Sequence, residues 1–490
     1  NVPLTVVEAG IYYDDVTLFA REQVFIDKGK DGSANGSDIG ALVAADRLLA
    51  KGKLRHQYPH SWRSKAPLIF RNTPQWFISM EKNNLRDKAL AAIDSVTWHP
   101  KTGRNRIHAM IENRPDWVVS RQRAWGVPLT VFVHRETGEI LRDDAVNARI
   151  VDAVRARGAD AWFDDDPQTF LGDDYAAADY DRVTDILDVW FDSGVTHAFV
   201  LEARPDLQWP ADVYLEGSDQ HRGWFHSSLL EACATRGQAP YKQVVTHGFT
   251  MDEKGRKMSK SLGNTVDPQK VIGQSGAEII RLWVMSSDYS DDTRVGPEII
   301  KANTDAYRKM RNCFRFLLGN LAHLDNAEKM PRGEMPELER YILHRLHELD
   351  QLVRASYNQF DFRKIYQALF NFMTIDLSAF YFDIRKDTLY CDPASSADLR
   401  ACRSVLDIAF TCLTRWLAPI LCFTTEEVWQ ARYNDPNNSV HLETFFDVPS
   451  DWHDAELAEK WNNIRAVRRV VTGALEIERR EKRIGSSLEA

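Results

Sequence analysis

The spacing of apolar residues changes near residue 300, and this change constrains the fold more than any other feature of the chain. Between 186 and 300, helical stretches alternate with the short apolar runs ILDVWF, DVYLEG and QVVTHGF, which we expect to be strands. Beyond about residue 300, apolar residues recur at spacings of three and four, the period of an amphipathic helix. The sequence therefore predicts an α/β part followed by an all-α part.

In the α/β part, strands that alternate with helices indicate parallel βαβ units. Ligands of such sheets bind beyond the carboxyl ends of the strands. The polar segments EGSDQH (216–221) and THGF (246–249) lie at two of these ends. We therefore expect them to meet at one crevice, together with the polar loop 252–264.

The all-α part is expected to be an antiparallel helix bundle, because short polar links separate its helical stretches. These stretches are 300–325, 336–358, 362–387, 397–415, 420–433 and 455–482. Nearer the N-terminus, the pattern predicts a hairpin at 130–141 and a helix from about 145 to 156.

The length, cysteine count and net charge of the chain restrict the class of protein. A chain of 490 residues exceeds what one core usually organises, so two to four domains are expected. Six scattered cysteines without a C-x-x-C pair favour buried free thiols in a reducing compartment over disulfides or zinc. The net charge of −9 argues against wholesale coating by nucleic acid but allows a local basic surface. No apolar run approaches the length of a membrane helix.

The loop 252–264, DEKGRKMSKSLGN, concentrates four cations, two serines and two glycines. It lacks the Walker A pattern, yet Lys257 and Lys260 can bind polyphosphate oxygens, and Ser259 and Ser261 add donors. A hinged cationic loop can close on a triphosphate and stabilise the charge that develops as pyrophosphate leaves. A solvated basic turn is the alternative for an isolated loop of this composition.

The string KMSKS (257–261) resembles the signature loop of class I aminoacyl-tRNA synthetases. Further segments, in family order, are similar to isoleucyl-tRNA synthetases: TPQWF (73–77), SRQRAWGVP (120–128), DVWFDSG (188–194), YLEGSDQHRGWF (214–225), THGFTMDEKGRKMSKSLGNTVDPQ (246–269) and LSAFYFDIRKDTLY (377–390). The resemblance covers nearly the whole chain. It implies an ATP-dependent ligase that forms isoleucyl-adenylate and passes isoleucine to its tRNA.

The resemblance also implies roles for individual residues. The residues implied to line the adenylate pocket are Glu216, Gly217, Asp219 and Gln220, and those implied to contact ATP are His247, Lys257, Ser259 and Lys260, the two lysines being catalytic. Trp190 and Trp224, at the polar ends of expected strands, would form the isoleucine pocket. The chemistry of these side chains agrees with the implied roles, because Glu216 can accept hydrogen bonds from an ammonium group and Asp219 can accept them from ribose hydroxyls. Taken singly, such residues more often cap helices, form turns or pack in cores.

By the same resemblance, the chain divides into four parts. Residues 1–55 would be a remnant of the inserted editing domain, 56–185 connective segments, 186–300 the second half of a Rossmann-type catalytic domain, and 301–490 the anticodon-binding bundle. The partners implied are isoleucine-accepting tRNA, isoleucine and ATP with Mg²⁺. We expect a cytoplasmic monomer without a membrane partner or a resident metal, and zinc only in a region that follows this chain in the family.

Two groups of arginines are candidates for contact with tRNA phosphates. Arg308, Arg311 and Arg315 recur at helical spacing, and Arg468 and Arg469 lie in a basic cluster near the C-terminus. A solvated face explains each group about as well, because acidic residues are interspersed.

The sequence departs from the family at its second signature, H-I-G-H, which is absent along with most of the editing domain. We therefore expect a fragment of a longer enzyme that forms little adenylate alone, and isoleucine-dependent exchange of pyrophosphate into ATP by this chain would contradict that expectation. A non-catalytic tRNA-binding module is one alternative, although it would have little use for the loop 257–261. A valyl-type relative is another.

Overall fold

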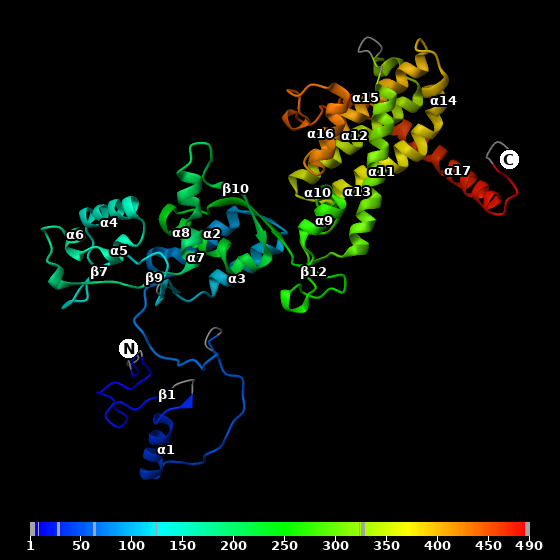
Figure 1. Ribbon diagram of the computed structural model, residues 1–490. Coiled ribbons are helices and arrows are strands. Elements are labelled where there is room, and N and C mark those ends of the chain that lie inside the picture. The colour runs from blue at the N-terminus through cyan, green and yellow to red at the C-terminus, as the bar shows by residue number, and fades with distance from the viewer. Residues whose placement is uncertain are drawn as a thin grey trace. The chain divides into compact units, whose positions relative to one another are not determined.

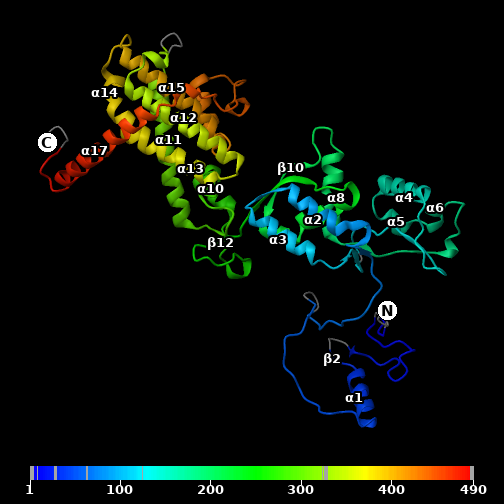
Figure 2. The ribbon, with the colours of Figure 1, turned by 180° about the vertical axis from the view of Figure 1, so that it is seen from behind.

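The computed structural model describes residues 5–7, 9–26, 30–61, 65–123, 125–322, 324 and 329–485, so Ala124 of the quoted segment 120–128 lies outside the described residues. The chain forms two compact units (Figures 1 and 2). The first combines Asn1–Leu85 with Arg114–Ser193, and the second combines Arg86–Asn113 with Gly194–Ala490. The range expected to be connective is thus divided between the two units.

The first unit is built from short antiparallel ladders and small helices. Its strand pairs are β1 (Phe25–Ile26) with β2 (Lys30–Asp31), β3 (Phe77–Ile78) with β5 (Trp117–Val118), β6 (Ser120–Arg121) with β9 (Ile186–Leu187), and β7 (Phe132–His134) with β8 (Tyr180–Arg182). Its helices are α1 (Ala34–Ala44), α4 (Asp144–Arg157), α5 (Ala161–Asp164) and α6 (Pro167–Leu171), and α7 (Val189–Gly194) ends at the boundary with the second unit.

A compact core forms around Trp162, whose side chain is fully buried between Phe132 and Phe170. The predicted helix from about 145 to 156 is confirmed as α4, which begins where the Asp143 carboxylate accepts hydrogen bonds from two backbone N–H groups. The predicted hairpin at 130–141 is confirmed by a bridge between Val133 and Ile140.

The second unit contains a parallel sheet with the strand order β10–β11–β4. The strands predicted for DVYLEG and QVVTHGF are confirmed as β10 (Ala211–Gly217) and β11 (Tyr241–His247). The third strand, β4 (Thr97–His99), comes from the range expected to be connective. The helices α2 (Leu85–Ser95), α3 (Thr102–Glu112) and α8 (Trp224–Arg236) surround this sheet in Figure 1.

The strand predicted for ILDVWF is wrong beyond Leu187, because α7 begins at Val189. The Asp188 carboxylate accepts a hydrogen bond from the Trp190 N–H at 3.3 Å, which favours a helical start. The period of a short continuous apolar run does not distinguish a strand from a helix. The sequence pattern alone therefore did not predict the helix that begins at Val189.

The helical part follows the predicted pattern closely. Its helices are α9 (Pro268–Ser275), α10 (Ala277–Ser286), α11 (Pro297–Leu321), α12 (Glu337–Asn358), α13 (Phe362–Asn371), α14 (Asp383–Cys391), α15 (Ala397–Leu417), α16 (Cys422–Tyr433) and α17 (Ala455–Arg480). The single stretch predicted at 362–387 is divided by a π-helical segment, Phe372–Phe382, between α13 and α14. One continuous core joins α10 to α17, with Tyr341, Tyr381 and Trp416 fully buried.

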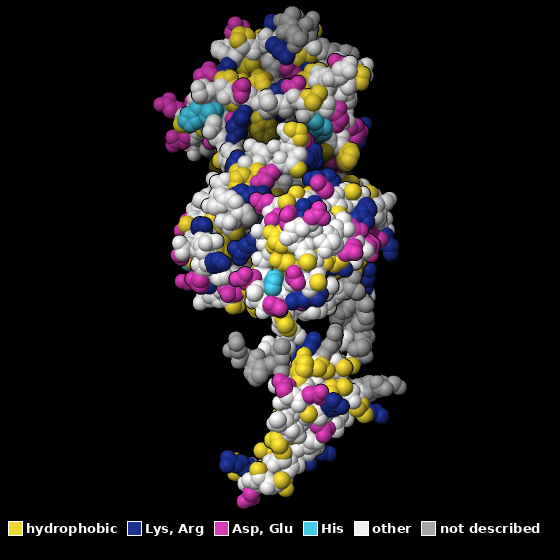
Figure 3. Space-filling view, turned by 90° about the vertical axis from the view of Figure 1, so that its left-hand side faces the viewer, with side chains coloured by type: hydrophobic (Ala, Val, Ile, Leu, Met, Phe, Trp, Pro, Cys, Tyr) yellow, Lys and Arg dark blue, Asp and Glu magenta, His cyan; other side chains and the backbone are white. Residues whose placement is uncertain are grey.

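The surface mixes charges of both signs. On the face that Figure 3 shows, Lys and Arg side chains lie among Asp and Glu side chains. Among the described residues, no helix is both long enough and apolar enough to cross a membrane. The prediction of buried free thiols is confirmed for Cys233, Cys313, Cys402 and Cys412. Cys422 is a half-buried free thiol, and the expected burial is wrong for Cys391, which is free but exposed.

A buried ion pair fixes α12 against α14. The Arg385 guanidinium donates two hydrogen bonds to the fully buried Glu339 carboxylate, at 2.7 and 2.6 Å, and the Tyr381 hydroxyl donates a third at 3.0 Å. Removing one partner of such a pair leaves the other charge desolvated and unneutralised.

We expect Glu339→Ala to lower the free energy of unfolding by about 3–5 kcal/mol, because Arg385 then keeps a buried charge without its partner. Denaturant titration measures this. Lys386→Ala on the same helix is the matched control: its ion pair with Asp383 is exposed, so its loss costs at most about 1 kcal/mol. Equal effects of the two substitutions would contradict the prediction.

Candidate active site

The carboxyl ends of β10 and β11 lie side by side, as the sequence predicts. Glu216 lies opposite Thr246, and Gly217 lies opposite His247. The chain then leaves β10 through a 3-10 turn, Ser218–Arg222, into α8. The two polar segments therefore form one edge of the sheet, as expected for a ligand site of a parallel sheet.

The four residues assigned to the adenylate pocket form one connected group. The Glu216 carboxylate accepts the Gly217 N–H at 3.0 Å. The Gln220 side-chain amide donates to the Asp219 carboxylate at 3.2 Å. The side-chain oxygen Oε1 of Gln220 accepts the Trp224 N–H at 3.0 Å, at the start of α8. A Cβ at position 217 would lie 2.5 Å from an Asp219 carboxylate oxygen, so glycine is required for Asp219 to fold back here.

The two tryptophans assigned to the isoleucine pocket lie in different units. Trp224 begins α8 and stacks on Tyr214, with ring centroids 4.1 Å apart and planes 8° apart. Trp190 lies in α7 of the first unit and is 42% exposed. It lies in a helix rather than at the end of a strand, because the strand predicted for ILDVWF ends at Leu187.

His247 ends β11 and donates from Nδ1 to the Gly248 carbonyl at 2.8 Å. This hydrogen bond leaves Nε2 for another partner. A Cβ on the neighbouring Gly217 would lie 3.6 Å from the His247 ring, so ring and turn are in close contact. His247 and the adenylate group are thus brought together by the strand register.

The Asp252 carboxylate organises the loop 252–264. It accepts the backbone N–H groups of Lys254 and Arg256, the Arg256 guanidinium and the side-chain amide of Asn264. These hydrogen bonds, led by the one from the Arg256 backbone, hold the pKa of Asp252 well below its usual range. Asn264 also accepts the Ser259 N–H at 2.9 Å, so both ends of the loop are tied together.

The signature residues stand on this organised loop. The Lys257 ammonium lies 4.9 Å from the centre of the Phe249 ring, a cation–π contact. The Ser259 hydroxyl accepts the Leu262 N–H at 3.2 Å and lies 3.1 Å from that of Ser261. Lys260 starts the short 3-10 turn Lys260–Leu262, is exposed, and has no ion pair with a described residue. Its ammonium group is therefore available to a ligand.

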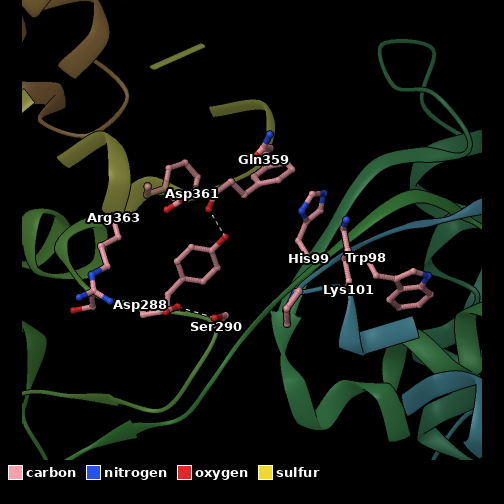
Figure 4. A pocket seen from close by; sticks show the side chains of 13 residues that line it. Trp98, His99, Lys101, Asp288, Ser290, Gln359, Asp361 and Arg363 are labelled. Atoms are coloured by element: carbon pink, nitrogen blue, oxygen red, sulfur yellow. Dashed lines mark hydrogen bonds and ion pairs between the residues drawn. The ribbon is translucent and has the colours of Figure 1, made fainter. Parts of the chain in front are cut away.

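Two cavities lie in the second unit. One, of about 550 Å³, lies between the end of β4 and the α12–α13 loop; Figure 4 shows His99 and Lys101 on one side of it and Asp288 and Arg363 on the other. The other, of about 650 Å³, opens beyond the carboxyl ends of all three parallel strands, and we call it the strand-end cavity.

Sequence reasoning missed both cavities, because both depend on the position of β4. Pro100, which follows β4, lines both cavities, and the start of α3 lines the strand-end cavity. The segment TWHPKTG (97–103) carries one signal that could have been used: an apolar position followed by a proline and a helix start. Neither Lys257 nor Lys260 is among the described residues that line either cavity.

The arginines assigned to tRNA differ in the partners of their side chains. Arg311 donates two hydrogen bonds to Glu427 of α16, which raise the pKa of Arg311, and Arg468 pairs with Asp383 at 2.8 Å. Arg308 makes an exposed ion pair with Asp305 of its own helix. Arg315 and Arg469 are exposed and have no ion pair with a described residue. Arg311 and Arg468 therefore fasten helices, whereas Arg315 and Arg469 remain free to contact a ligand.

No group of three or more His, Cys, Asp or Glu side chains in the described part of the chain is arranged to hold a metal ion. The candidate site offers carboxylates and an amide at the ends of β10 and β11, and the loop 252–264 adds lysine ammonium groups. This combination can bind ammonium, hydroxyl and phosphate groups.

Two family models match the chain. The model described as tRNA synthetases class I (I, L, M and V) matches residues 2–296, and the model described as anticodon-binding domain of tRNA ligase matches residues 339–490.

Curated proteins similar to the chain share more than half of its residues. They include the isoleucine--tRNA ligases of Brucella abortus (59% identical over 502 aligned positions), Mesorhizobium japonicum (58%) and Agrobacterium fabrum (60%). Each alignment covers 100% of this chain, but only 51%, 50% and 52% of the respective relative. The chain therefore spans about half the length of the curated relatives that it matches.

Solved structures resemble the chain in fold. A Mycobacterium tuberculosis methionyl-tRNA synthetase in complex with methionyl-adenylate aligns at a TM-score of 0.55 and 19% identity, covering 78% of this chain and 67% of that one. An Agrobacterium radiobacter LeuRS–tRNA–LeuAMS complex aligns at 0.54 and 20% identity, covering 69% of this chain and 43% of the other.

We expect the loop to keep its hydrogen bonds down to about pH 4. Because folding lowers the pKa of Asp252, its stabilising effect is complete above the unfolded pKa of about 3.9 and is lost as the pH falls through the folded pKa. Hydrogen exchange of the Arg256 and Ser259 amides, measured from pH 7 downwards, tests this. Protection that fades between pH 7 and 5 would contradict it.

At neutral pH, Asp252→Asn should speed exchange of the Arg256 amide by roughly tenfold, because its charged acceptor is lost. The Gly276 amide, which donates to Ile272 in α9, is the internal control and should not change.

Proposed function

Since the chain belongs to the class I tRNA synthetases, we propose that it is part of an isoleucine–tRNA ligase, which joins isoleucine to ATP and passes it to tRNA. The part consists of the second half of a Rossmann-type catalytic fold and an anticodon-binding bundle. The observation that carries this proposal is the register of β10 and β11, which sets the Glu216 turn beside His247 at one strand edge.

The proposed adenylate group acts by hydrogen bonding. Glu216 accepts from the ammonium group of isoleucine, Asp219 accepts from ribose hydroxyls, and Gln220 holds Asp219 in place. The side-chain pocket is assigned to Trp224, whose ring is fixed by stacking on Tyr214, and to Trp190. Aromatic walls suit an aliphatic side chain, but they discriminate poorly between chains that differ by one methylene.

The proposed role of the loop is to hold the triphosphate. Lys260 and Lys257 bind phosphate oxygens and stabilise the charge of the departing pyrophosphate. Ser259 caps the turn that presents Lys260 and can donate to a phosphate, and His247 can form a hydrogen bond to the adenylate through Nε2. Mg²⁺ arrives with ATP, whose oxygens are its usual ligands, and neutralises part of the phosphate charge.

The bundle is proposed to bind tRNA through its free cations. Arg315 and Arg469 serve as phosphate contacts, whereas Arg308, Arg311 and Arg468 act mainly through their carboxylate partners. We also propose a cytoplasmic monomer without a membrane partner. The free thiols support a reducing compartment.

We expect Lys260→Ala to lower isoleucine-dependent exchange of pyrophosphate into ATP by about 100-fold in the full-length ligase to which we assign this chain. The loss follows from removing a charge that stabilises the leaving group. Lys254→Ala is the matched control, because Lys254 is an exposed lysine of the same loop outside the signature.

The same assay tests the choice of amino acid. Isoleucine should support exchange far better than leucine or methionine, and better than valine. A preference for valine would overturn the assignment, as would equal losses from Lys254→Ala and Lys260→Ala.

We expect Arg315→Ala to weaken tRNA binding several-fold and to lower the slope of log affinity against log salt by about one, because one phosphate contact is lost. Filter binding between 50 and 200 mM salt measures both quantities. Arg155→Ala on α4, where Arg155 pairs with Asp152, is the control and should leave the slope unchanged. An unchanged slope in Arg315→Ala would remove this residue from the interface.

A further inference from the structure

Three of the sequence segments that resemble the family meet in the first unit, where α7 begins. The Ser120 hydroxyl donates to the Gln75 side chain at 2.7 Å, which joins SRQRAWGVP to TPQWF. Ser120 lies in β6, and β6 pairs with β9, the strand directly before α7 and the rest of DVWFDSG. The proposed function uses the last of these segments, through Trp190, but gives no role to the other two.

Asp188 holds the start of α7. One of its carboxylate oxygens accepts the Trp190 N–H at 3.3 Å, and its backbone carbonyl accepts the Phe191 N–H at 2.8 Å and the Asp192 N–H at 3.2 Å. The Asp188 N–H itself donates to the Val119 carbonyl at 2.7 Å. The position of Trp190 on α7 therefore follows from the position of Asp188.

Arg121 holds the other oxygen of the Asp188 carboxylate. One nitrogen of the Arg121 guanidinium donates to Asp188 Oδ2 at 2.7 Å. Another donates to the carbonyls of Val118 and Ser120, at 3.1 and 2.8 Å. The Asp188 side chain is only 9% exposed, so its charge depends on charge-assisted hydrogen bonds within the protein. Because a guanidinium presents its donors in a fixed plane, Arg121 sets the direction of this carboxylate as well as neutralising it.

Other charges near Asp188 make its position depend on Arg121. Burial lowers the pKa of Arg114, and the Asp188 charge opposes this effect, so Arg114 is a second cation near the carboxylate. On α7, burial and the Asp188 charge raise the pKa of Asp192. Without Arg121, attraction to Arg114 and repulsion from Asp192 would decide where the Asp188 side chain lies.

We propose that Arg121 is a positioning residue for amino-acid selection: by holding the Asp188 carboxylate, it fixes the start of α7 and thereby the Trp190 wall of the isoleucine pocket. The inference rests on the proposed function, which assigns Trp190 to that pocket. Arg121 acts through Asp188 and does not need to touch the substrate. Because dispersion attraction falls steeply with distance, a small displacement of an aromatic wall weakens its contact with an aliphatic side chain.

The test is amino-acid-dependent exchange of pyrophosphate into ATP by the full-length ligase to which we assign this chain. We expect Arg121→Met to raise the KM for isoleucine about tenfold, because the pocket wall is displaced, and to narrow the preference for isoleucine over valine. The KM for ATP should not change. A substitution that only destabilised the fold would lower the amount of active enzyme and leave both KM values as they are.

Two further substitutions in the same segment sharpen the comparison. Arg123→Met is the matched control, because Arg123 is exposed and makes no ion pair with a described residue, so both KM values should stay the same. Arg121→Lys keeps the charge but not the planar set of donors, so it should recover only part of the affinity for isoleucine. Thermal melting of each variant checks that the fold is kept.

Hydrogen exchange of this chain tests the contact without any activity. Arg121→Met should speed exchange in peptides that contain Trp190, Phe191 and Asp192, because the carboxylate that organises the start of α7 is released. Peptides of α4, in the same unit, are the internal reference and should not change.

An unchanged KM for isoleucine in Arg121→Met would overturn the proposal, as would equal increases in the KM values for isoleucine and ATP, or unchanged exchange at residues 190–192. Equal effects of Arg121→Met and Arg123→Met would also overturn it.

Trp190→Ala separates this outcome from that of the proposed function. If Trp190→Ala raises the KM for isoleucine and Arg121→Met does not, only the role of Arg121 fails. If Trp190→Ala leaves that KM unchanged, the assignment of Trp190 to the pocket fails, and the role of Arg121 fails with it.

Discussion

Parallel pairing of β10 with β11 is the contact on which the candidate site depends. Its register sets Gly217 beside His247, and a slip by one residue would turn every side chain of one strand to the opposite face. The pairing is protected because Val244 and Val245 of β11 are fully buried. The polar turn at 218–222 can therefore expose Asp219 while His221 in the same turn is buried and the strands beneath it stay fixed.

Contacts of Asp252 and Glu253 order the cationic loop 252–264. Asp252 gathers the loop on itself, and the adjacent Glu253 accepts the Glu298 N–H in the first turn of α11 at 3.0 Å. A carboxylate is favoured at a helix N-terminus by the helix dipole. The loop is thus attached to the first long helix of the bundle, so the lysines lie on an anchored rather than a free segment.

Arginines that look equivalent in the sequence serve different purposes in the fold. Helical spacing correctly indicated that Arg308, Arg311 and Arg315 share a face of α11. Spacing could not reveal Glu427, because this partner lies on α16, more than a hundred residues later. The same holds for Arg468 and Asp383. A pattern identifies the face of a helix, whereas the partner that neutralises a charge comes from another element.

By itself, the sequence determined the α/β and helical parts, the two longer parallel strands and the chemistry of the loop, because hydrophobic period and side-chain type are local properties. Only the tertiary structure decided that β4 joins the sheet with α3 packed beside it, that α7 replaces the end of an expected strand, and that Ser218 and His221 line the strand-end cavity. A strand of three residues has no measurable period, and β4 pairs with residues far along the chain. Its place, and the cavity beside it, are fixed by long-range pairing that no short stretch of sequence encodes.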